Sequence, residues 1–303
     1  MSGKVRIGIV GAGFAAHFHL ASYAKVVSQN FEIVAICDSG SGSNKAQALA
    51  DQFGVAKAYN SIDALLADPD VDVVDICVPN HLHMSLSARA AAAGKHVICE
   101  KPLGGFFGPE GADADWNAKG YSRAQMLKAV IAEADKVRAA LDASGVTFCY
   151  GENWVYAPPI VKLNRLLAAS GSTVMRIRGE ESHSGSHSEF AKRWRTAGGG
   201  ALLRLCVHPL GAALYLKAEE GRRRDGVPIR PTSVVASVAR LTEIPAFQAE
   251  EPKHMKTGWD DVEDWGSMLV TFEDGSVAEL TSTDTHLGGI HNYLTAYGSR
   301  AVV

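Results

Sequence analysis

A glycine turn near the N-terminus constrains the fold more than any other feature of this sequence. The run Gly11-Ala12-Gly13-Phe14-Ala15-Ala16 directly follows the apolar segment 5–10 and opens a helical pattern. Gly11 permits a tight turn, Gly13 lets the backbone approach a pyrophosphate, and Ala16 keeps the helix close to the strand. The pattern predicts a dinucleotide-binding unit, in which Phe14 and Ala15 lie in the first turn of the helix.

An acidic residue, Asp38, ends the second predicted strand about 25 residues after the glycine turn. Its carboxylate is placed to accept hydrogen bonds from both ribose hydroxyl groups, and it should repel a 2′-phosphate. We therefore expect NAD rather than NADP as the cofactor. NADP stays open as the less favoured alternative, because the polar run 39–45 could admit a phosphate beside Lys45.

The first 150 residues alternate between strand and helix patterns. Nearly continuous apolar strands between helices predict a doubly wound parallel sheet, which is a Rossmann fold. Segment 103–121 breaks this rhythm and is expected to be a long loop. We expect strands at 5–10, 32–37, 71–78, 94–99 and 146–150, and helices at 15–28, 44–53, 61–67 with Ser61 as cap, 84–93 and 122–143.

After about residue 150 the pattern changes to longer, alternating strands at 173–179, 233–241, 265–272 and 276–282. They predict an open, mainly antiparallel sheet. An apolar helix is expected at 201–217, followed by an exposed charged loop at 219–231. The sequence thus predicts two α/β domains, residues 1–149 with the insert 103–121, and residues 150–303.

The composition excludes several classes of protein. The 303 residues are 47% hydrophobic and 21% charged, with a formal net charge of −3, which is typical of a globular domain. Without a basic excess or a long apolar stretch, we expect neither nucleic acid nor membrane as a partner. The five cysteines lack metal-ligand spacing, so we expect buried, reduced thiols in a cytoplasmic protein, and no metal.

A second motif, Glu100-Lys101-Pro102, follows the apolar run 96–99. It places a lysine at the carboxyl end of a parallel strand, where such sheets bind their ligands. The sequence resembles the glucose–fructose oxidoreductase / inositol dehydrogenase / rhizopine-catabolism (Gfo/Idh/MocA) family. The matching segments are 9–13, 75–80 with His83, 93–102, Trp194-Arg195, 198–200 and His208.

The resemblance implies a Rossmann domain and a second α/β domain whose open sheet faces the nicotinamide. It implies oxidation or reduction of a sugar, polyol or related compound, and a homo-oligomer, dimer or tetramer, formed through the face of that sheet. Relatives usually continue with a further strand and helix. This chain is therefore expected to be either a short member or a truncated one.

The resemblance also assigns residues to the site. It places Lys101 near the nicotinamide and the reacting hydroxyl, and it makes His208 a second proton acceptor, as a neutral imidazole can be near pH 7. The implied cofactor contacts beyond the glycine turn and Asp38 are Pro79, Asn80, His83, Glu100 and Lys101. The implied substrate contacts are Asn153, Tyr156 and Arg195.

Arg204 departs from the family pattern, which often has aspartate four residues before the histidine at position 208. Arginine cannot act as a base. It could bind an anionic substrate group and lower the pKa of a nearby lysine or histidine. We therefore expect an acidic substrate, or one with a strong hydrogen-bond acceptor, near Arg204.

The polar run 180–187 contains two histidines, His183 and His187, that are four residues apart. On a helix they could share a metal, but the glycine and serines between them make a helix unfavourable. We expect them to contact substrate, and an exposed loop is the alternative. His286 and His291 are weaker candidates for the same roles.

Three functions fit these residues. The leading one is a dehydrogenase that transfers hydride between NAD and a hydroxyl carbon of a sugar, polyol or sugar acid. A second is an NAD-dependent glycosidase or lyase that oxidises a sugar transiently and cleaves a bond without net NADH. A third is a non-catalytic, cofactor-sensing regulator, against which the presence of both Lys101 and His208 argues.

Overall fold

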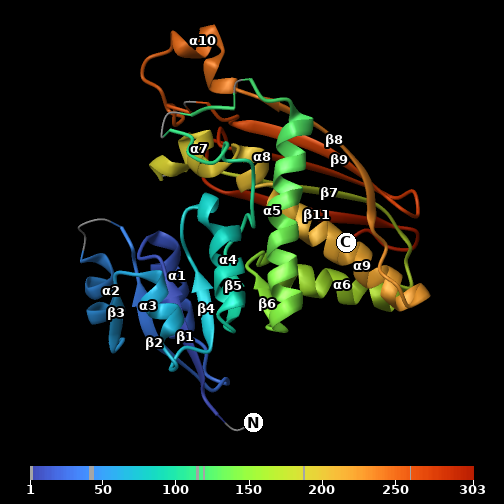
Figure 1. Cartoon of the computed structure of the whole chain (residues 1–303). Helices are drawn as coiled ribbons and strands as arrows, with labels where there is room; N and C mark the ends of the chain where they lie inside the picture. Colours follow the sequence, from blue (N-terminus) through green and yellow to red (C-terminus); the bar gives the residue numbers. More distant parts are fainter. Residues whose placement is uncertain (1–2, 41–43, 114–115, 119, 187, 260) are drawn as a thin grey trace. The chain divides into compact units, whose positions relative to one another are not determined.

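The computed structural model describes residues 3–40, 44–113, 116–118, 120–186, 188–259 and 261–303. The chain forms two compact units, Met1–Phe106 with Gly120–Gly151, and Phe107–Lys119 with Glu152–Val303 (Figure 1). The boundary thus lies two residues beyond the expected one. The expected insert also divides, because its described residues 107–113 and 116–118 belong to the second unit.

The first unit is built on a parallel sheet in the order β3-β2-β1-β4-β5-β6. This order is that of a dinucleotide-binding Rossmann fold, and it confirms the doubly wound sheet. The short strand β3 was not predicted. The strands are β1 (Val5–Val10), β2 (Phe31–Cys37), β3 (Lys57–Tyr59), β4 (Val73–Ile76), β5 (His96–Cys99) and β6 (Phe148–Tyr150).

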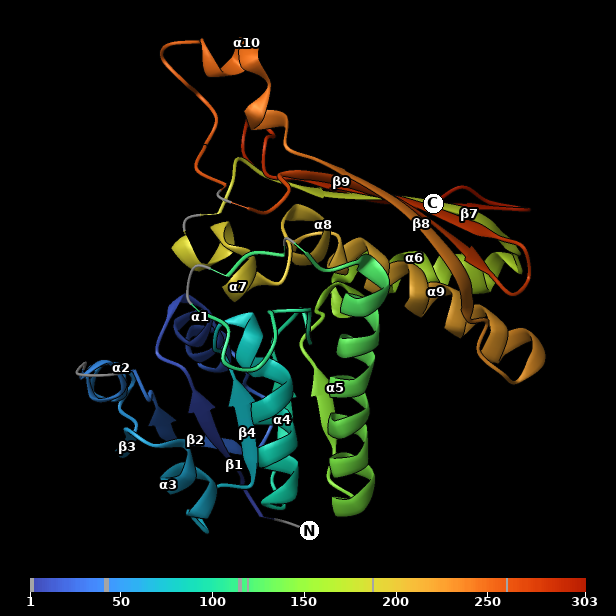
Figure 2. The ribbon, with the colours of Figure 1, turned by 45° about the horizontal axis from the view of Figure 1, so that its top comes forward.

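In the described part of this unit the strands are joined by the helices α1 (Phe14–Tyr23), α2 (Lys45–Phe53), α3 (Ile62–Ala67), α4 (His83–Ala92) and α5 (Arg123–Ser144). Figures 1 and 2 show α4 and α5 side by side. Ser122 caps α5 through a reciprocal capping box with Gln125, and Gly145 ends the helix at φ 67°. Ser61 precedes α3 as expected, but its side chain makes no capping hydrogen bond.

All five cysteines are free, as expected. Four are buried, whereas Cys149 is exposed. The expectation of burial was wrong for Cys149 because β6 is an edge strand of the first sheet.

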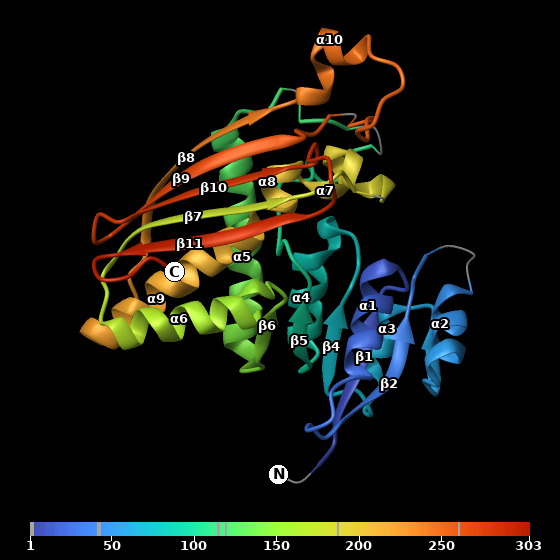
Figure 3. The ribbon, with the colours of Figure 1, turned by 180° about the vertical axis from the view of Figure 1, so that it is seen from behind.

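The second unit contains a mixed sheet in the order β11-β7-β10-β9-β8 (Figure 3). Among the described strands only the pair β7 and β10 is parallel, so the prediction of a mainly antiparallel sheet is confirmed. The last strand, β11, was not predicted. The strands are β7 (Val174–Ser182), β8 (Pro231–Ala239), β9 (Trp265–Phe272), β10 (Val277–Thr283) and β11 (His291–Gly298).

Helices α6 (Pro158–Ser170) and α9 (Val207–Asp225) lie along one face of this sheet, as Figure 2 shows. Between helices and sheet lies an apolar core that includes Leu163, Ile177 and Leu216. Among the described residues no helix packs on the opposite face, which we call the open face. The remaining helices are short: α7 (Trp194–Ala197), α8 (Ala201–Arg204) and α10 (Pro245–Gln248).

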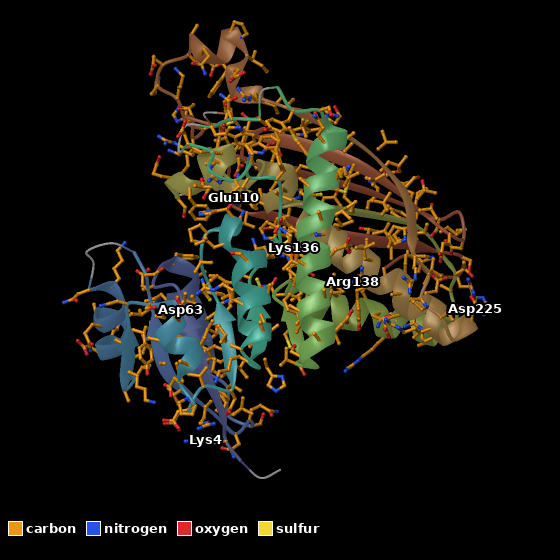
Figure 4. All side chains as sticks on the ribbon, in the orientation of Figure 1. Lys4, Asp63, Glu110, Lys136, Arg138 and Asp225 are labelled. Atoms are coloured by element: carbon orange, nitrogen blue, oxygen red, sulfur yellow. The ribbon has the colours of Figure 1, made fainter. Side chains whose placement is uncertain are left out.

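The predicted helix 201–217 and loop 219–231 were both wrong in extent. The helix is interrupted after Arg204. A second helix, α9, then extends to Asp225, which Figure 4 labels at the end of α9. Helix continues because Lys217 and Glu220 face the core and pair there, with 2.6 Å between Lys217 Nζ and Glu220 Oε2. Gly226, at φ 78°, ends the helix.

Within the described part of the chain, no single helix has both the length and the apolar character needed to cross a membrane. The bent pair Trp194–Arg204 and Val207–Asp225 meets those two criteria only when its members are joined.

Candidate active site

The glycine turn has the geometry that the sequence predicts. Gly11 follows β1 at φ 106°, and a Cβ atom there would stand 2.2 Å from the carbonyl oxygen of Cys77. Only glycine therefore fits this position. Gly13 precedes the first turn of α1, and no atom lies within 4 Å of where its Cβ would stand. Ala16 is fully buried against the strand.

Asp38 lies directly after β2, whose last residue, Cys37, pairs with Val10 at the end of β1. The carboxylate and the glycine turn therefore share the carboxyl edge of the sheet. Asp38 Oδ1 accepts a hydrogen bond from the backbone N–H of Gly40 at 3.2 Å. The open space at Gly13, the helix N-terminus and this carboxylate fit the pyrophosphate and ribose of a dinucleotide.

Lys101 follows β5 at the same edge of the sheet. Its backbone N–H donates to Glu100 Oε2 at 3.0 Å. The other oxygen of Glu100 lies 3.0 Å from His19 Nε2, on α1. The glycine-turn helix and the lysine segment are therefore joined through one imidazole.

His19 lies between two carboxylates, since its Nδ1 is 2.9 Å from Asp75 Oδ2. Tyr23 donates a further hydrogen bond to that oxygen at 2.9 Å. Burial alone would lower the pKa of His19, but hydrogen bonds to Asp75, Cys77 and Glu100 raise this pKa to about 12. The ring is therefore an imidazolium at neutral pH, and it holds the pKa of Glu100 below its ordinary value against the effect of burial.

His83 is only 1% exposed. Its Nδ1 lies 2.7 Å from the carbonyl oxygen of Pro102, and its Nε2 lies 2.9 Å from that of Val78. Burial lowers the pKa of His83, and the hydrogen bonds to the two carbonyl oxygens oppose this effect. His83 thus connects the end of β4 to the residue after Lys101.

The second unit contains a buried histidine–carboxylate pair. His208, in the first turn of α9, donates from Nδ1 to Glu152 Oε1 at 2.8 Å. The same oxygen accepts the backbone N–H of Trp154 at 3.0 Å, and the Trp154 ring stacks on His208 with centroids 5.9 Å apart. The imidazole is therefore fixed in both orientation and tautomer, with its proton on Nδ1.

Arg204, at the end of α8, is 7% exposed and donates from Nη2 to Asp284 Oδ2. Its guanidinium also lies over the Trp259 ring, 5.6 Å from the centroid. His183 Nδ1 is 3.5 Å from the other oxygen of Asp284. Two predicted substrate contacts, Arg204 and His183, are thus brought together by a carboxylate that the sequence did not single out.

Burial raises the pKa of Asp284 to about 6, although the Arg204 guanidinium lowers it. The backbone N–H of Gly185 donates to His183 Nδ1 at 3.0 Å, which makes that nitrogen an acceptor. Above pH 6 Asp284 is therefore mainly a carboxylate, and it compensates the charge of Arg204.

Arg195 lies elsewhere in the second unit. It donates from Nη1 to the carbonyl oxygen of Phe107 at 2.9 Å, and from Nε and Nη2 to that of Ala112 at 3.3 and 3.2 Å. These bonds fasten the 107–112 segment to α7. Gly198 supports the same packing, because its Cβ would stand 2.6 Å from the Phe107 ring.

The remaining predicted residues differ in accessibility. Tyr156, in the short 3₁₀ helix Trp154–Tyr156, is 77% exposed, and Asn153 beside it is exposed as well. In the first unit, Pro79 is half-buried and Asn80 is buried at the end of β4. Phe14 is exposed on the first turn of α1, and Ala15 is half-buried. His187 lies outside the described residues.

Sequence reasoning did not single out Glu152, Asp284 or His19. Glu152 lies two residues after β6, at the start of the second unit, and this position was its signal in the sequence. His19 and Asp284 become recognisable only when the fold brings distant segments together, since Asp284 is 80 residues from Arg204.

Two models of a single family match most of the chain. Residues 5–113 match one described as an oxidoreductase family with an NAD-binding Rossmann fold, and residues 172–303 match the Gfo/Idh/MocA C-terminal domain. Levoglucosan dehydrogenase of Pseudarthrobacter phenanthrenivorans is 26% identical over 96% of this chain and 70% of its own length. Inositol 2-dehydrogenase of Salmonella typhimurium is 42% identical over 33% of this chain.

The latter match spans only 29% of the length of the inositol dehydrogenase. Among solved structures, levoglucosan dehydrogenase in complex with NADH and L-sorbose superposes with a TM-score of 0.74 at 23% identity. That superposition covers 99% of this chain and 72% of the other. The fold is thus shared over the whole length of the chain, and the two sequence models are the N- and C-terminal parts of one family. The chain belongs to the Gfo/Idh/MocA oxidoreductase family.

Proposed function

We propose that this protein is an NAD-dependent dehydrogenase that transfers a hydride between NAD(H) and a hydroxyl carbon of a sugar, polyol or sugar acid. The glycine turn, with open space at Gly13 and a carboxylate at Asp38, supports a dinucleotide site. The names of the relatives, levoglucosan dehydrogenase and inositol 2-dehydrogenase, support a sugar or polyol substrate. The observation that carries the proposal is the buried pair of His208 and Glu152.

The cofactor is held by the first unit. Gly11, Gly13 and the first turn of α1 bind the pyrophosphate, and Asp38 accepts hydrogen bonds from the ribose hydroxyls. The carboxylate favours NAD over NADP, because it would repel a 2′-phosphate. When bound, the nicotinamide supplies the hydride acceptor, and the protein supplies orientation and the proton acceptor.

His208 takes the proton of the substrate hydroxyl on Nε2. A carboxylate at Nδ1 keeps the proton on that nitrogen, which leaves the lone pair on Nε2. When the ring becomes an imidazolium, Glu152 stabilises its charge. The pair therefore provides a carboxylate–histidine arrangement. The family often has an aspartate for this purpose at the position of Arg204, and here Glu152 supplies the carboxylate instead.

Lys101 is the second catalytic residue that we propose. The contacts that support this role all lie in the first unit. Its segment is held from two sides, by Glu100 with His19 and by His83 through Pro102. We assign His83 and Glu100 to the positioning of Lys101 rather than to direct contact with the cofactor. Pro79 and Asn80 stay proposed cofactor contacts.

Substrate contacts are proposed for Asn153 and Tyr156, which are exposed, and for His183 and Arg204. His187 is proposed by sequence alone. Because Asp284 compensates the charge of Arg204, an anionic group would bind there best when Asp284 is protonated. Arg195 is assigned to holding the 107–112 segment. It therefore affects substrate binding only through that segment.

We also propose that the protein forms a homo-oligomer through the open face of the second sheet, which exposes Val235 and Leu269. A dimer or a tetramer fits this proposal, and the molar mass from light scattering tests it. The five free thiols support a cytoplasmic location.

The activity is tested by following NADH absorbance with NAD and a panel of polyols, aldoses and sugar acids. The matched variants are Lys101→Ala and His208→Ala, with NAD binding measured by fluorescence for each. Sustained NADH production that both substitutions abolish, with NAD binding retained by His208→Ala, is the expected result. If no compound gives net NADH while NAD binds, the proposal is wrong.

A further inference from the structure

We propose that Glu180, His286 and His291 bind one divalent transition-metal ion, such as Zn²⁺, at the β11 edge of the open face. This edge is opposite the strands β8 and β9, which expose Val235 and Leu269. A ligand atom from each of these three side chains lies within 4.8 Å of the other two. All three belong to the second unit, and none takes part in the proposed reaction. The metal-site proposal can therefore be tested independently of the dehydrogenase activity.

The strand register places two of the ligands on one face. β11 runs antiparallel to β7, with His291 opposite Ser182 and Tyr293 opposite Glu180. Since alternate residues of a strand share a face, His291 and Glu180 are diagonal neighbours on the same face. His291 Nδ1 lies 3.3 Å from Glu180 Oε1.

His286 supplies the third ligand from the connection between β10 and β11. Its backbone N–H donates to the carbonyl oxygen of His183 at 3.2 Å, which anchors this end of the connection to the end of β7. Its ring stacks on that of His291, with centroids 5.0 Å apart and planes 11° apart. The two imidazoles therefore lie next to each other.

The chemistry of this set suits Zn²⁺. Two imidazoles and a carboxylate are a common protein ligand set for zinc, in which water completes the coordination. Glu180 is oriented by the Ser182 hydroxyl, which donates to Oε1 at 2.7 Å, as outer hydrogen bonds orient metal-binding carboxylates. His291 is exposed, which gives an ion access from solvent.

A second cluster, His19, Asp75 and Cys77 in the first unit, has similar spacing but different chemistry. Its imidazole is already protonated between two carboxylates. Both of its nitrogens already lie against carboxylates, Nδ1 at 2.9 Å from Asp75 and Nε2 at 3.0 Å from Glu100, so neither is open to an ion. The contrast favours the Glu180 cluster as the metal site.

The test is calorimetric titration of the untagged protein with ZnCl₂ at pH 7.5. We expect saturable binding of one ion, together with a rise in Tm, because an ion that binds only the folded state stabilises it. His286→Ala, His291→Ala and Glu180→Gln are each expected to weaken binding by about tenfold or more. His254→Ala, which changes an exposed histidine elsewhere in the second unit, is the matched control.

Binding should also weaken at pH 5.5, because imidazoles must be neutral to bind a metal. Each variant's Tm without metal shows whether its fold is intact, and His286→Asn or His291→Asn replaces the alanine variant at the same position if that variant does not fold. Absence of saturable Zn²⁺ binding to the wild type would overturn the proposal. Equal affinity in the wild type and the two histidine variants would overturn it as well.

Discussion

Gly211 lies so close to the carboxylate of Glu152 that any larger residue would have to displace it: a Cβ at this position would stand 2.5 Å from Oε2. Gly211 is in α9, three residues after His208, and it contacts the partner of that histidine. Glycine inside a helix costs roughly 0.5–1 kcal/mol relative to alanine. Helix α9 thus contains a weak helix former where Glu152 needs space.

Gly211→Ala should impair the reaction without harming the helix. The added methyl group displaces the Glu152 carboxylate and with it the His208 ring, and we expect kcat to fall by roughly tenfold to hundredfold. Affinity for NAD should not change, because the cofactor residues lie in the other unit. Steady-state kinetics and NAD titration test this.

The control for Gly211→Ala is the same substitution in a Glu152→Ala background, where no carboxylate remains to be displaced. There Gly211→Ala should cost almost nothing further. Additive losses in the double variant would show that the glycine acts through something other than Glu152.

Glu152→Gln should change the pH dependence of the reaction. A carboxylate beside an imidazole favours its protonated form, so its removal should lower the apparent pKa of the base in the profile of kcat/KM. We also expect kcat to fall, since an amide stabilises the imidazolium less well. Glu189→Gln, at an exposed acid of the same unit, should leave the profile unchanged, and an unshifted profile for Glu152→Gln would contradict the pairing.

The Rossmann sheet was predictable because its signals are local. Apolar runs end in a glycine turn at Gly11 and in an acid at Asp38, and both positions follow from the sequence alone. The extent of α9 was not predictable in this way. Lys217 and Glu220 look like surface residues in sequence, and only the fold shows that they pair in the core.

The candidate site was predictable in part for a similar reason. Lys101 and His208 can be recognised from their sequence motifs. The residues that hold them can be recognised only from their proximity in the folded structure. Glu152 is 56 residues from His208, and His19 is 81 residues from Glu100. Arg195 shows the converse, since its motif indicated substrate while its guanidinium binds backbone carbonyls of the 107–112 segment.

His19→Gln should destabilise the first unit in a pH-dependent way. The variant leaves Asp75 and Glu100 without a cation, which should cost about 3 kcal/mol or more at pH 6. Because the pKa of His19 is raised, the stability that its proton provides is greatest below the ordinary pKa of about 6.5 and declines as pH rises towards 12. The difference from wild type should therefore shrink between pH 6 and 9.

Urea unfolding at both pH values measures this difference. His17→Gln, an exposed change on the same helix, is the control. A difference that grows with pH would show that His19 is not the cation.

Lys217→Met should destabilise the second unit. Lys217 is 0% exposed, and its Nζ donates to Glu220 at 2.6 Å, Asp274 at 2.8 Å and the carbonyl oxygen of Val174 at 3.0 Å. Removing the cation leaves two carboxylates facing each other, at a cost of roughly 3–5 kcal/mol. Urea unfolding measures it, and Lys162→Met, exposed on α6, should have little effect. Equal stabilities for the two variants would contradict the buried pairing.

Asp284→Asn should alter stability between pH 4 and 7. Since burial raises the pKa of Asp284 to about 6, the stability linked to its proton is present below about pH 4 and is lost as pH rises through 6. A pKa shift of about two units corresponds to about 3 kcal/mol of unfolding free energy. The wild type should lose this stability between pH 4 and 7, and Asp284→Asn should not. Asp225→Asn, an exposed change at the end of α9, is the control.

The same variant tests what Arg204 recognises. In the wild type above pH 6, the Asp284 carboxylate compensates the guanidinium, whereas in Asp284→Asn this contribution is missing at every pH. If Arg204 binds an anionic group, KM for sugar acids should fall in the variant at pH 7.5, while KM for neutral polyols stays constant. In the wild type, KM for sugar acids should fall as the pH drops through 6. Equal changes for acids and polyols would place the anionic group elsewhere, because only a charge at the guanidinium separates the two classes.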